Sequence, residues 1–149
     1  MGFTTCRAGR VFAVRWTNTT VEGVERVSAE AKRYQRSLGK ELIYVSVTGE
    51  DCPPPSEEAR NALVDGAKDL ASVCERIFVV LEGQGFRGSV LRSVLASLML
   101  LSRMRNTIQV SPSVEEVLSS LAGSPGFEEG LVRRAFLREG ILLSPTGTE

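Results

Sequence analysis

The most informative absence is histidine, which occurs nowhere in the 149 residues. Histidine is the commonest general base and the commonest ligand of transition metals, and it is the base of the usual serine and cysteine hydrolases. The sequence therefore argues against the enzyme classes that depend on it. We predict a protein that has no catalytic residues, binds no metal and carries no cofactor.

Cysteine is scarce, and its positions form no pattern. The three cysteines, Cys6, Cys52 and Cys74, are an odd number without C-x-x-C spacing. This indicates neither a disulfide framework nor a zinc site. Free thiols are typical of a reducing compartment, so we expect a cytoplasmic protein.

The chain also lacks an excess of charge of either sign and a long apolar run. Its 18 basic and 18 acidic side chains cancel, so no overall attraction draws it to nucleic acid. The most apolar window, Val90 to Leu101, contains Arg92, Ser93 and Ser97 and is too short to span a bilayer. The first ten residues lack the apolar stretch of a signal peptide. We expect a soluble protein that neither binds nucleic acid nor inserts into membranes.

Strand-like and helix-like patterns alternate along the chain. Runs rich in apolar, β-branched and aromatic residues predict strands over residues 4–8, 11–16, 41–48, 76–82 and 106–111. Apolar spacings of three and four predict helices at about 19–39, 56–73, 86–102, 113–123 and 127–140. Capping residues support three of the helix starts, at Thr19, Ser56 and Ser113.

This alternation predicts an α/β fold with right-handed crossovers. We expect a mixed, largely parallel sheet of four to five strands, with an antiparallel edge formed by a hairpin at Gly9-Arg10. Val11 to Val14 are apolar at every position, which predicts a central strand covered on both faces. The α/β domain is expected to span 1–123, and 124–149 to form a C-terminal helical extension and tail.

The last predicted helix has one face that we expect to be buried. Its apolar side is formed by Phe127, Leu131, Ala135 and Phe136. This helix can dock either on the core of its own chain or on a partner.

A glycine-rich turn follows the predicted strand over 76–82. Gly83-Gln84-Gly85-Phe86-Arg87-Gly88 matches Gly-x-Gly-x-x-Gly, which can bind a dinucleotide pyrophosphate through backbone N–H groups. Glu82 places a negative charge beside such a phosphate, and no acidic residue lies about twenty positions on to hold a ribose. The turn is therefore interpreted mainly as a sharp structural link into a helix. That helix is apolar on most sides, which predicts a core element or a dimer contact.

The order of elements, together with the loop that leads into a helix at Ser56, resembles the STAS domain of anti-sigma factor antagonists and its lipid-transfer-like relatives. The resemblance covers about Phe3 to Ala122. It implies a STAS-like sheet and a cytoplasmic domain that binds a kinase-type partner. It also implies phosphorylation of a serine that starts the second helix within Asp-x-Ser-Gly. Ser56 stands instead in Pro-Pro-Pro-Ser-Glu, so its role as a helix N-cap is favoured.

Acidic residues follow two strands that should be neighbours. Glu50 and Asp51 come after one predicted strand and Glu82 ends the next, at the carboxyl ends where open α/β sheets usually bind ligands. These carboxylates either hold Mg²⁺ or are solvated loop charges, and the second interpretation is the commoner one. Phe86 and Arg87, at the tip of the glycine turn, are residue types enriched at binding hot spots.

We predict a non-catalytic protein-interaction or regulatory module. Its contact surface is expected to include Glu50, Asp51, Ser56, Glu82 and the turn from Gly83 to Arg87. The partner is an unidentified protein, and a homodimer is expected from the apolar surface of the third and last helices. Two alternatives stay open: a carrier of a small ligand, lipid or nucleotide, and an immunity-type inhibitor of one cognate protein.

Overall fold

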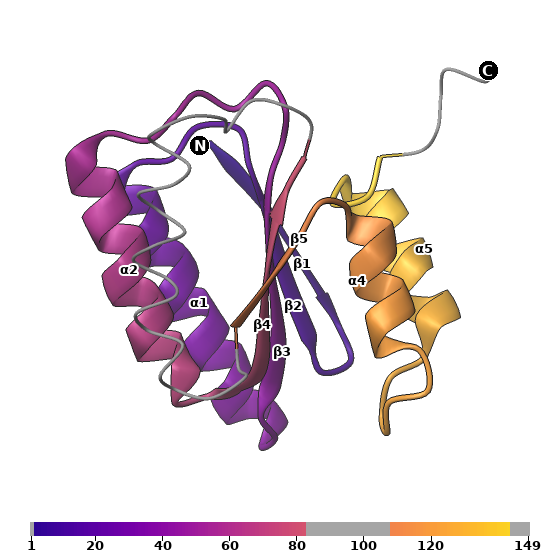
Figure 1. Cartoon of the computed structure of the whole chain (residues 1–149). Coiled ribbons are helices and arrows are strands. Elements are labelled where there is room, and N and C mark those ends of the chain that lie inside the picture. The colour runs from indigo at the N-terminus through magenta and orange to yellow at the C-terminus, as the bar shows by residue number, and fades with distance from the viewer. Residues whose placement is uncertain (1, 83–107, 144–149) are drawn as a thin grey trace.

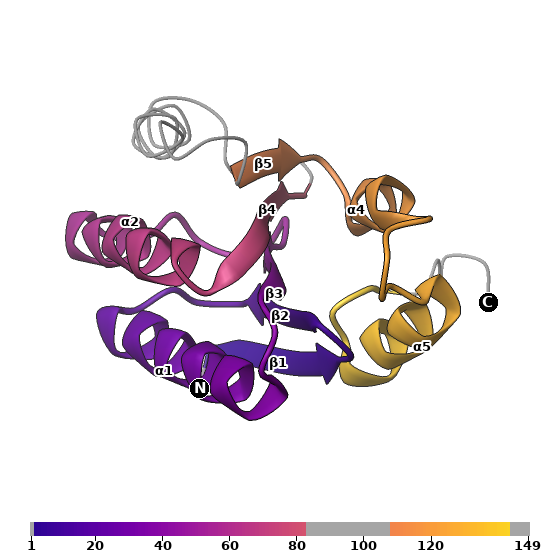
Figure 2. The ribbon, with the colours of Figure 1, turned by 90° about the horizontal axis from the view of Figure 1, so that it is seen from below.

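The alternating strands and helices fold into three layers (Figures 1 and 2). The computed structural model describes residues 2–82 and 108–143. Its elements are β1 (Phe3–Ala8), β2 (Val11–Trp16), α1 (Val21–Leu38), β3 (Leu42–Thr48), α2 (Glu57–Ala71), β4 (Cys74–Leu81), β5 (Ile108–Ser111), α4 (Val114–Leu121) and α5 (Glu129–Glu139). The predicted helix over 86–102 lies outside the described residues.

The described strands form one five-stranded sheet in the order β1-β2-β3-β4-β5. β1 and β2 pair antiparallel, and the other three pairs are parallel. Helices α1 and α2 cover one face of the sheet, and α4 and α5 cover the other (Figure 2). The predicted α/β class, the largely parallel sheet and its antiparallel edge are all confirmed.

β2 is the strand that both helix layers bury. All six of its residues are buried, which confirms the prediction of a central strand. Phe12, Val14 and Trp16 belong to the core on the α1 and α2 side, whereas Val11 and Ala13 belong to the core on the α4 and α5 side. A strand with two buried faces has no solvent-facing side, so the residues of β2 from Val11 to Val14 are all apolar rather than alternating.

The helix caps are close to those predicted, with one correction. Ser56 Oγ accepts a hydrogen bond from Ala59 N at 3.1 Å, so Ser56 caps α2 as expected. The N-cap of α1 is Thr20, whose hydroxyl accepts from Gly23 N, and not Thr19. Two adjacent threonines offer the same capping chemistry, and Thr19 is instead buried with its Oγ1 3.9 Å from Cys52 Sγ.

The buried side of α5 also differs from the prediction. Leu131 is 46% exposed, so its assignment to the buried face was wrong. Ala135 and Phe136 are buried as predicted, and Val132 takes the place of Leu131 in the buried stripe. These residues join α4 and the sheet in one hydrophobic cluster, so α5 packs on the core of its own chain.

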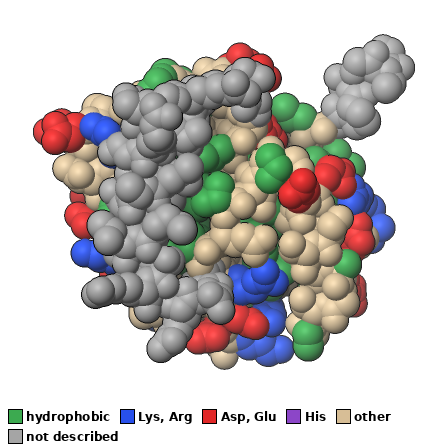
Figure 3. Space-filling view, viewed as in Figure 1, with side chains coloured by type: hydrophobic (Ala, Val, Ile, Leu, Met, Phe, Trp, Pro, Cys, Tyr) green, Lys and Arg blue, Asp and Glu red, His purple; other side chains and the backbone are tan. Residues whose placement is uncertain are grey.

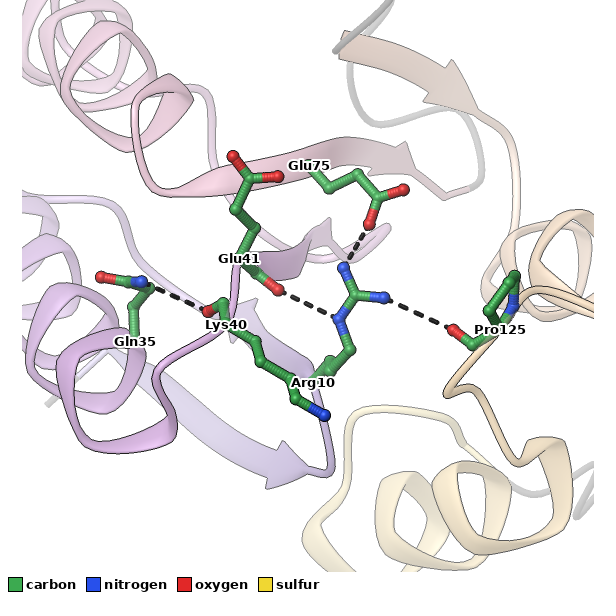
Figure 4. A network of polar contacts seen from close by, with 6 residues as sticks. All are labelled: Arg10, Gln35, Lys40, Glu41, Glu75 and Pro125. Carbon is green, nitrogen blue, oxygen red and sulfur yellow. Dashed lines mark hydrogen bonds and ion pairs between the residues drawn. The ribbon is translucent and has the colours of Figure 1, made fainter.

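Arg10, in the hairpin turn between β1 and β2, joins several segments at the strand-entry end of the sheet (Figure 4). Its Nε donates to the Glu41 carbonyl at 3.1 Å, and Nη1 donates to the Pro125 carbonyl at 3.4 Å. Its Nη2 pairs with the Glu75 carboxylate. One side chain therefore connects the hairpin with β3, β4 and the link between α4 and α5.

Truncation of one α5 residue tests whether this helix unfolds together with the sheet. Phe136 is 0% exposed, so we expect Phe136→Ala to lower the free energy of unfolding by about 3 to 5 kcal/mol. Leu131→Ala, in the same helix, should change it by no more than about 0.5 kcal/mol because Leu131 is exposed. Urea unfolding followed by circular dichroism measures both. Equal, small effects would show that α5 is not part of the cooperative core.

Candidate functional site

The strand-exit end of the sheet brings together only part of the predicted site. β3 and β4 are parallel neighbours, so Glu50, Asp51 and Glu82 do follow adjacent strands at the same end. Their side chains have different environments, however: Glu50 and Asp51 are exposed, whereas Glu82 is half-buried and bound to an arginine. The remaining predicted residues, Gly83 to Arg87, lie outside the described residues.

The arginine that binds Glu82 is Arg15 of β2, which is only 8% exposed. Arg15 Nη1 and Nη2 donate to the two carboxylate oxygens of Glu82, each at 2.9 Å. Its Nε and Nη2 donate to the carbonyl oxygen of Ile141, at 3.1 and 2.7 Å. We call these contacts the Arg15 clamp. They place a bidentate ion pair inside the layer between the sheet and α5, where a charge without a partner would be costly.

Gly49, which follows β3, lies against the Arg15 clamp. A Cβ atom at this position would be 2.9 Å from Arg15 Nη1. Because β3 lies between β2 and β4, the Arg15 side chain must pass the end of β3 to reach Glu82. A glycine at that point lets the guanidinium pass close to the backbone.

Sequence reasoning missed Arg15, although a signal was present. Arginine is almost never buried without a partner, and Arg15 stands in the otherwise apolar strand sequence VFAVRW. An arginine in a strand covered on both faces therefore indicates a carboxylate at the same end of a nearby strand. Glu82 was the available residue, but it was assigned to a contact surface instead.

The loop between β3 and α2 is held at several points. Cys52 N donates to the Gly49 carbonyl at 3.1 Å, and the Cys52 side chain is buried beside Thr19. Pro55 is also buried, and Ser56 caps α2. Since three consecutive prolines also restrict the backbone, this loop presents its exposed side chains in a defined position.

Four exposed carboxylates lie on this loop and on the first turn of α2. Glu50, Asp51, Glu57 and Glu58, which we call the acidic rim, form no ion pair within the described part of the chain. Acidic side chains are visible over the start of α2 in Figure 3. Glu57 and Glu58 favour the positive end of the helix dipole, but Glu50 and Asp51 precede the helix and have no such role.

The cysteines offer no reactive thiol among the described residues. All three are free and buried. Burial raises the pKa of the Cys6 and Cys52 thiols, and burial together with the Glu41 carboxylate raises the pKa of Cys74 to about 12. The reactive form is the thiolate, so these side chains are poor nucleophiles near neutral pH.

No group of His, Cys, Asp and Glu within residues 2–82 and 108–143 is arranged to hold a metal ion. Over the same residues, no helix is both long and apolar enough to cross a membrane. Comparisons of the chain with protein-family models, with curated proteins and with solved structures return no match.

The Arg15 clamp can be tested by removing its cation. Arg15→Met leaves the half-buried Glu82 carboxylate without its counter-charge, so we expect the free energy of unfolding to fall by about 3 kcal/mol. The double variant Arg15→Met with Glu82→Gln also removes the carboxylate charge, so it should recover part of the lost free energy of unfolding. Urea unfolding measures the free energy of unfolding of the wild type, of Arg15→Met and of the double variant.

Arg7→Met is the matched control. The Arg7 and Glu30 ion pair is 3.7 Å long and more exposed. The Arg7 guanidinium also lies 5.7 Å from the rings of Phe12 and Tyr34, so loss of the Arg7 side chain should cost about 1 to 2 kcal/mol. If Arg15→Met and Arg7→Met destabilise the protein equally, the Arg15 clamp does not have the structural role assigned to it.

Proposed function

We propose that the chain is a non-catalytic, cytoplasmic protein-interaction module that binds a basic partner protein through the acidic rim. The observation that carries this proposal is that Glu50 and Asp51 are exposed on a loop with a fixed conformation and have no ion-pair partner in the described part of the chain. Neither residue caps a helix or neutralises a buried cation. A partner with clustered Lys or Arg side chains supplies the missing counter-charges.

The rigidity of the loop supports a binding role for these two residues. Ordering flexible side chains and loops on binding costs free energy, and a loop that is already ordered avoids part of that cost. Here the buried Cys52 and Pro55 hold the loop from inside. The carboxylates of Glu50 and Asp51 can therefore meet a partner without folding of the loop.

The arrangement of the sheet supports a STAS-like type of module. The strands are sequential, four of them are parallel, and α1 and α2 lie on the same face (Figure 1). On this proposal Ser56 is a helix N-cap rather than a phosphate acceptor, because its hydroxyl already accepts from Ala59 N and Glu57 follows it directly.

A homodimer remains part of the proposal. Leu131 and Leu137 on α5 are both exposed, and exposed leucines on one helix are suited to a second subunit. Size-exclusion chromatography with light scattering measures the oligomeric state directly, and a mass of one chain at every concentration would contradict this part of the proposal.

Charge reversal on the acidic rim tests the main proposal. We expect Glu50→Lys with Asp51→Lys to abolish capture of the partner from a lysate of the source organism, because four units of charge change at the contact. Capture by the wild type should weaken at about 0.5 M salt, since exposed charge pairs are screened. Quantitative mass spectrometry of the retained proteins provides the measurement.

The control carries the same change of charge elsewhere. Glu116 and Glu128 are exposed residues on the α4 and α5 side of the sheet, so Glu116→Lys with Glu128→Lys should retain the partner. Circular dichroism should show both variants folded. If the rim variant retains the same proteins as the wild type, or both variants lose them, the acidic rim is not the binding surface.

A further inference from the structure

An apolar cavity of about 80 Å³ lies between the sheet and the layer of α1 and α2. It reaches the strand-exit end, because Trp16, Thr48 and Leu81, the last residues of β2, β3 and β4, all line it. Helix α2 borders it with Leu63 and Ala67. The cavity therefore lies below the loop that carries the acidic rim, in the part of an open α/β sheet where ligands usually bind.

Small residues explain why this space is left unfilled. Gly66 allows α2 to approach α1 closely, since a Cβ atom there would be 3.1 Å from Ser28 Oγ. Ala67 on α2 and Ser46 on β3 also line the cavity with short side chains. The two helices thus pack against each other while the short side chains leave a gap above the sheet.

The chemistry of the lining selects a neutral molecule. None of the described residues that line the cavity is charged, so an ionic ligand would lose its hydration without gaining a counter-charge. Burial raises the pKa of Tyr44, another lining residue, which keeps its hydroxyl neutral at physiological pH. Most of the lining is aliphatic or aromatic, which favours a ligand with an alkyl part.

Three hydroxyl groups in the lining form no hydrogen bond within the described residues, and Tyr44, which is 7% exposed, carries one of them. Ser28 and Thr48, which are each 9% exposed, carry the other two. Ser46 differs, because its Oγ accepts from Trp16 Nε1 at 3.0 Å. A hydroxyl group that has no partner in the protein gains a hydrogen bond when a ligand supplies one. A ligand that carries one hydroxyl or carbonyl group can form this bond with Ser28, Tyr44 or Thr48.

The volume limits the size of the ligand. A cavity of about 150 Å³ accommodates benzene, so about 80 Å³ corresponds to about three or four non-hydrogen atoms. Drug-sized ligands occupy about 300 to 1,000 Å³, and a lipid or a nucleotide is far too large for the cavity. We propose that this cavity is a binding site for a small neutral molecule with a short alkyl part and one hydroxyl or carbonyl group.

The single tryptophan of the chain provides a built-in reporter, because Trp16 lines the cavity. We expect its fluorescence to change with 2-propanol or acetone along a saturable curve in the millimolar range. For four non-hydrogen atoms the Kd cannot be tighter than about 0.04 mM. Acetate has the same number of non-hydrogen atoms but is charged, so it should give no saturable change. A linear response to the neutral probes, or an equal response to acetate, would overturn the proposal.

Two variants connect the signal to the cavity. Ala67→Leu adds three carbon atoms to the lining and should abolish the saturable response, whereas Ala29→Leu adds the same atoms at an exposed position of α1 and should preserve it. Binding that survives Ala67→Leu would place the probe elsewhere.

Ser28→Ala gives a second test that does not depend on how Ala67→Leu folds. The loss of one hydrogen bond should raise the Kd of 2-propanol by about 2- to 12-fold. The urea midpoint of the free protein should not fall, because the Ser28 hydroxyl has no partner to lose. A Kd that is unchanged in each of Ser28→Ala, Tyr44→Phe and Thr48→Val, or a lower urea midpoint of Ser28→Ala, would contradict the proposed site. Glu50→Lys with Asp51→Lys should bind 2-propanol as the wild type does, since this site is independent of the acidic rim.

Discussion

The buried guanidinium of Arg15 imposes the strictest physical condition on this fold. A cation in the fully buried strand β2 requires a carboxylate and further acceptors, because burial removes the water that would otherwise solvate it. Glu82 and the Ile141 carbonyl meet that requirement. This one contact joins β2 to the residue that follows β4, requires a glycine at residue 49 and holds the chain that follows α5.

Two arginines of the first hairpin hold the C-terminal helices at opposite ends of the sheet. Arg10 donates to the Pro125 carbonyl at the strand-entry end, and Arg15 donates to the Ile141 carbonyl at the strand-exit end. Between them, Phe136 and its neighbours on α5 complete the apolar cluster on that face. The segment after residue 123, which the sequence analysis describes as a C-terminal extension, is therefore joined to the start of the chain by both polar and apolar contacts.

The features that the sequence predicts correctly are those with local causes. The apolar run from Val11 to Val14 in β2 and the serine caps of α2 and α4 each depend on residues within one turn or strand. The Arg15 clamp depends on residues 67 and 126 positions apart, and no local pattern records such a pair. Leu131 was misassigned because adjacent apolar residues on a helix differ by about 100° in direction, so one residue decides between core and solvent.

The same loop borders the cavity and carries the acidic rim, but it does not couple binding in the cavity to binding at the rim. Pro55, on the inner side of the loop, lines the cavity, whereas Glu50 and Asp51 are exposed to solvent. A molecule in the cavity could change binding at the rim only if it interacted differently with two conformations of the loop. Cys52, Pro55 and the Ser56 cap hold the loop in one conformation, and the prolines leave it few others to adopt. The structure therefore favours two independent sites at one end of the sheet over a single coupled one.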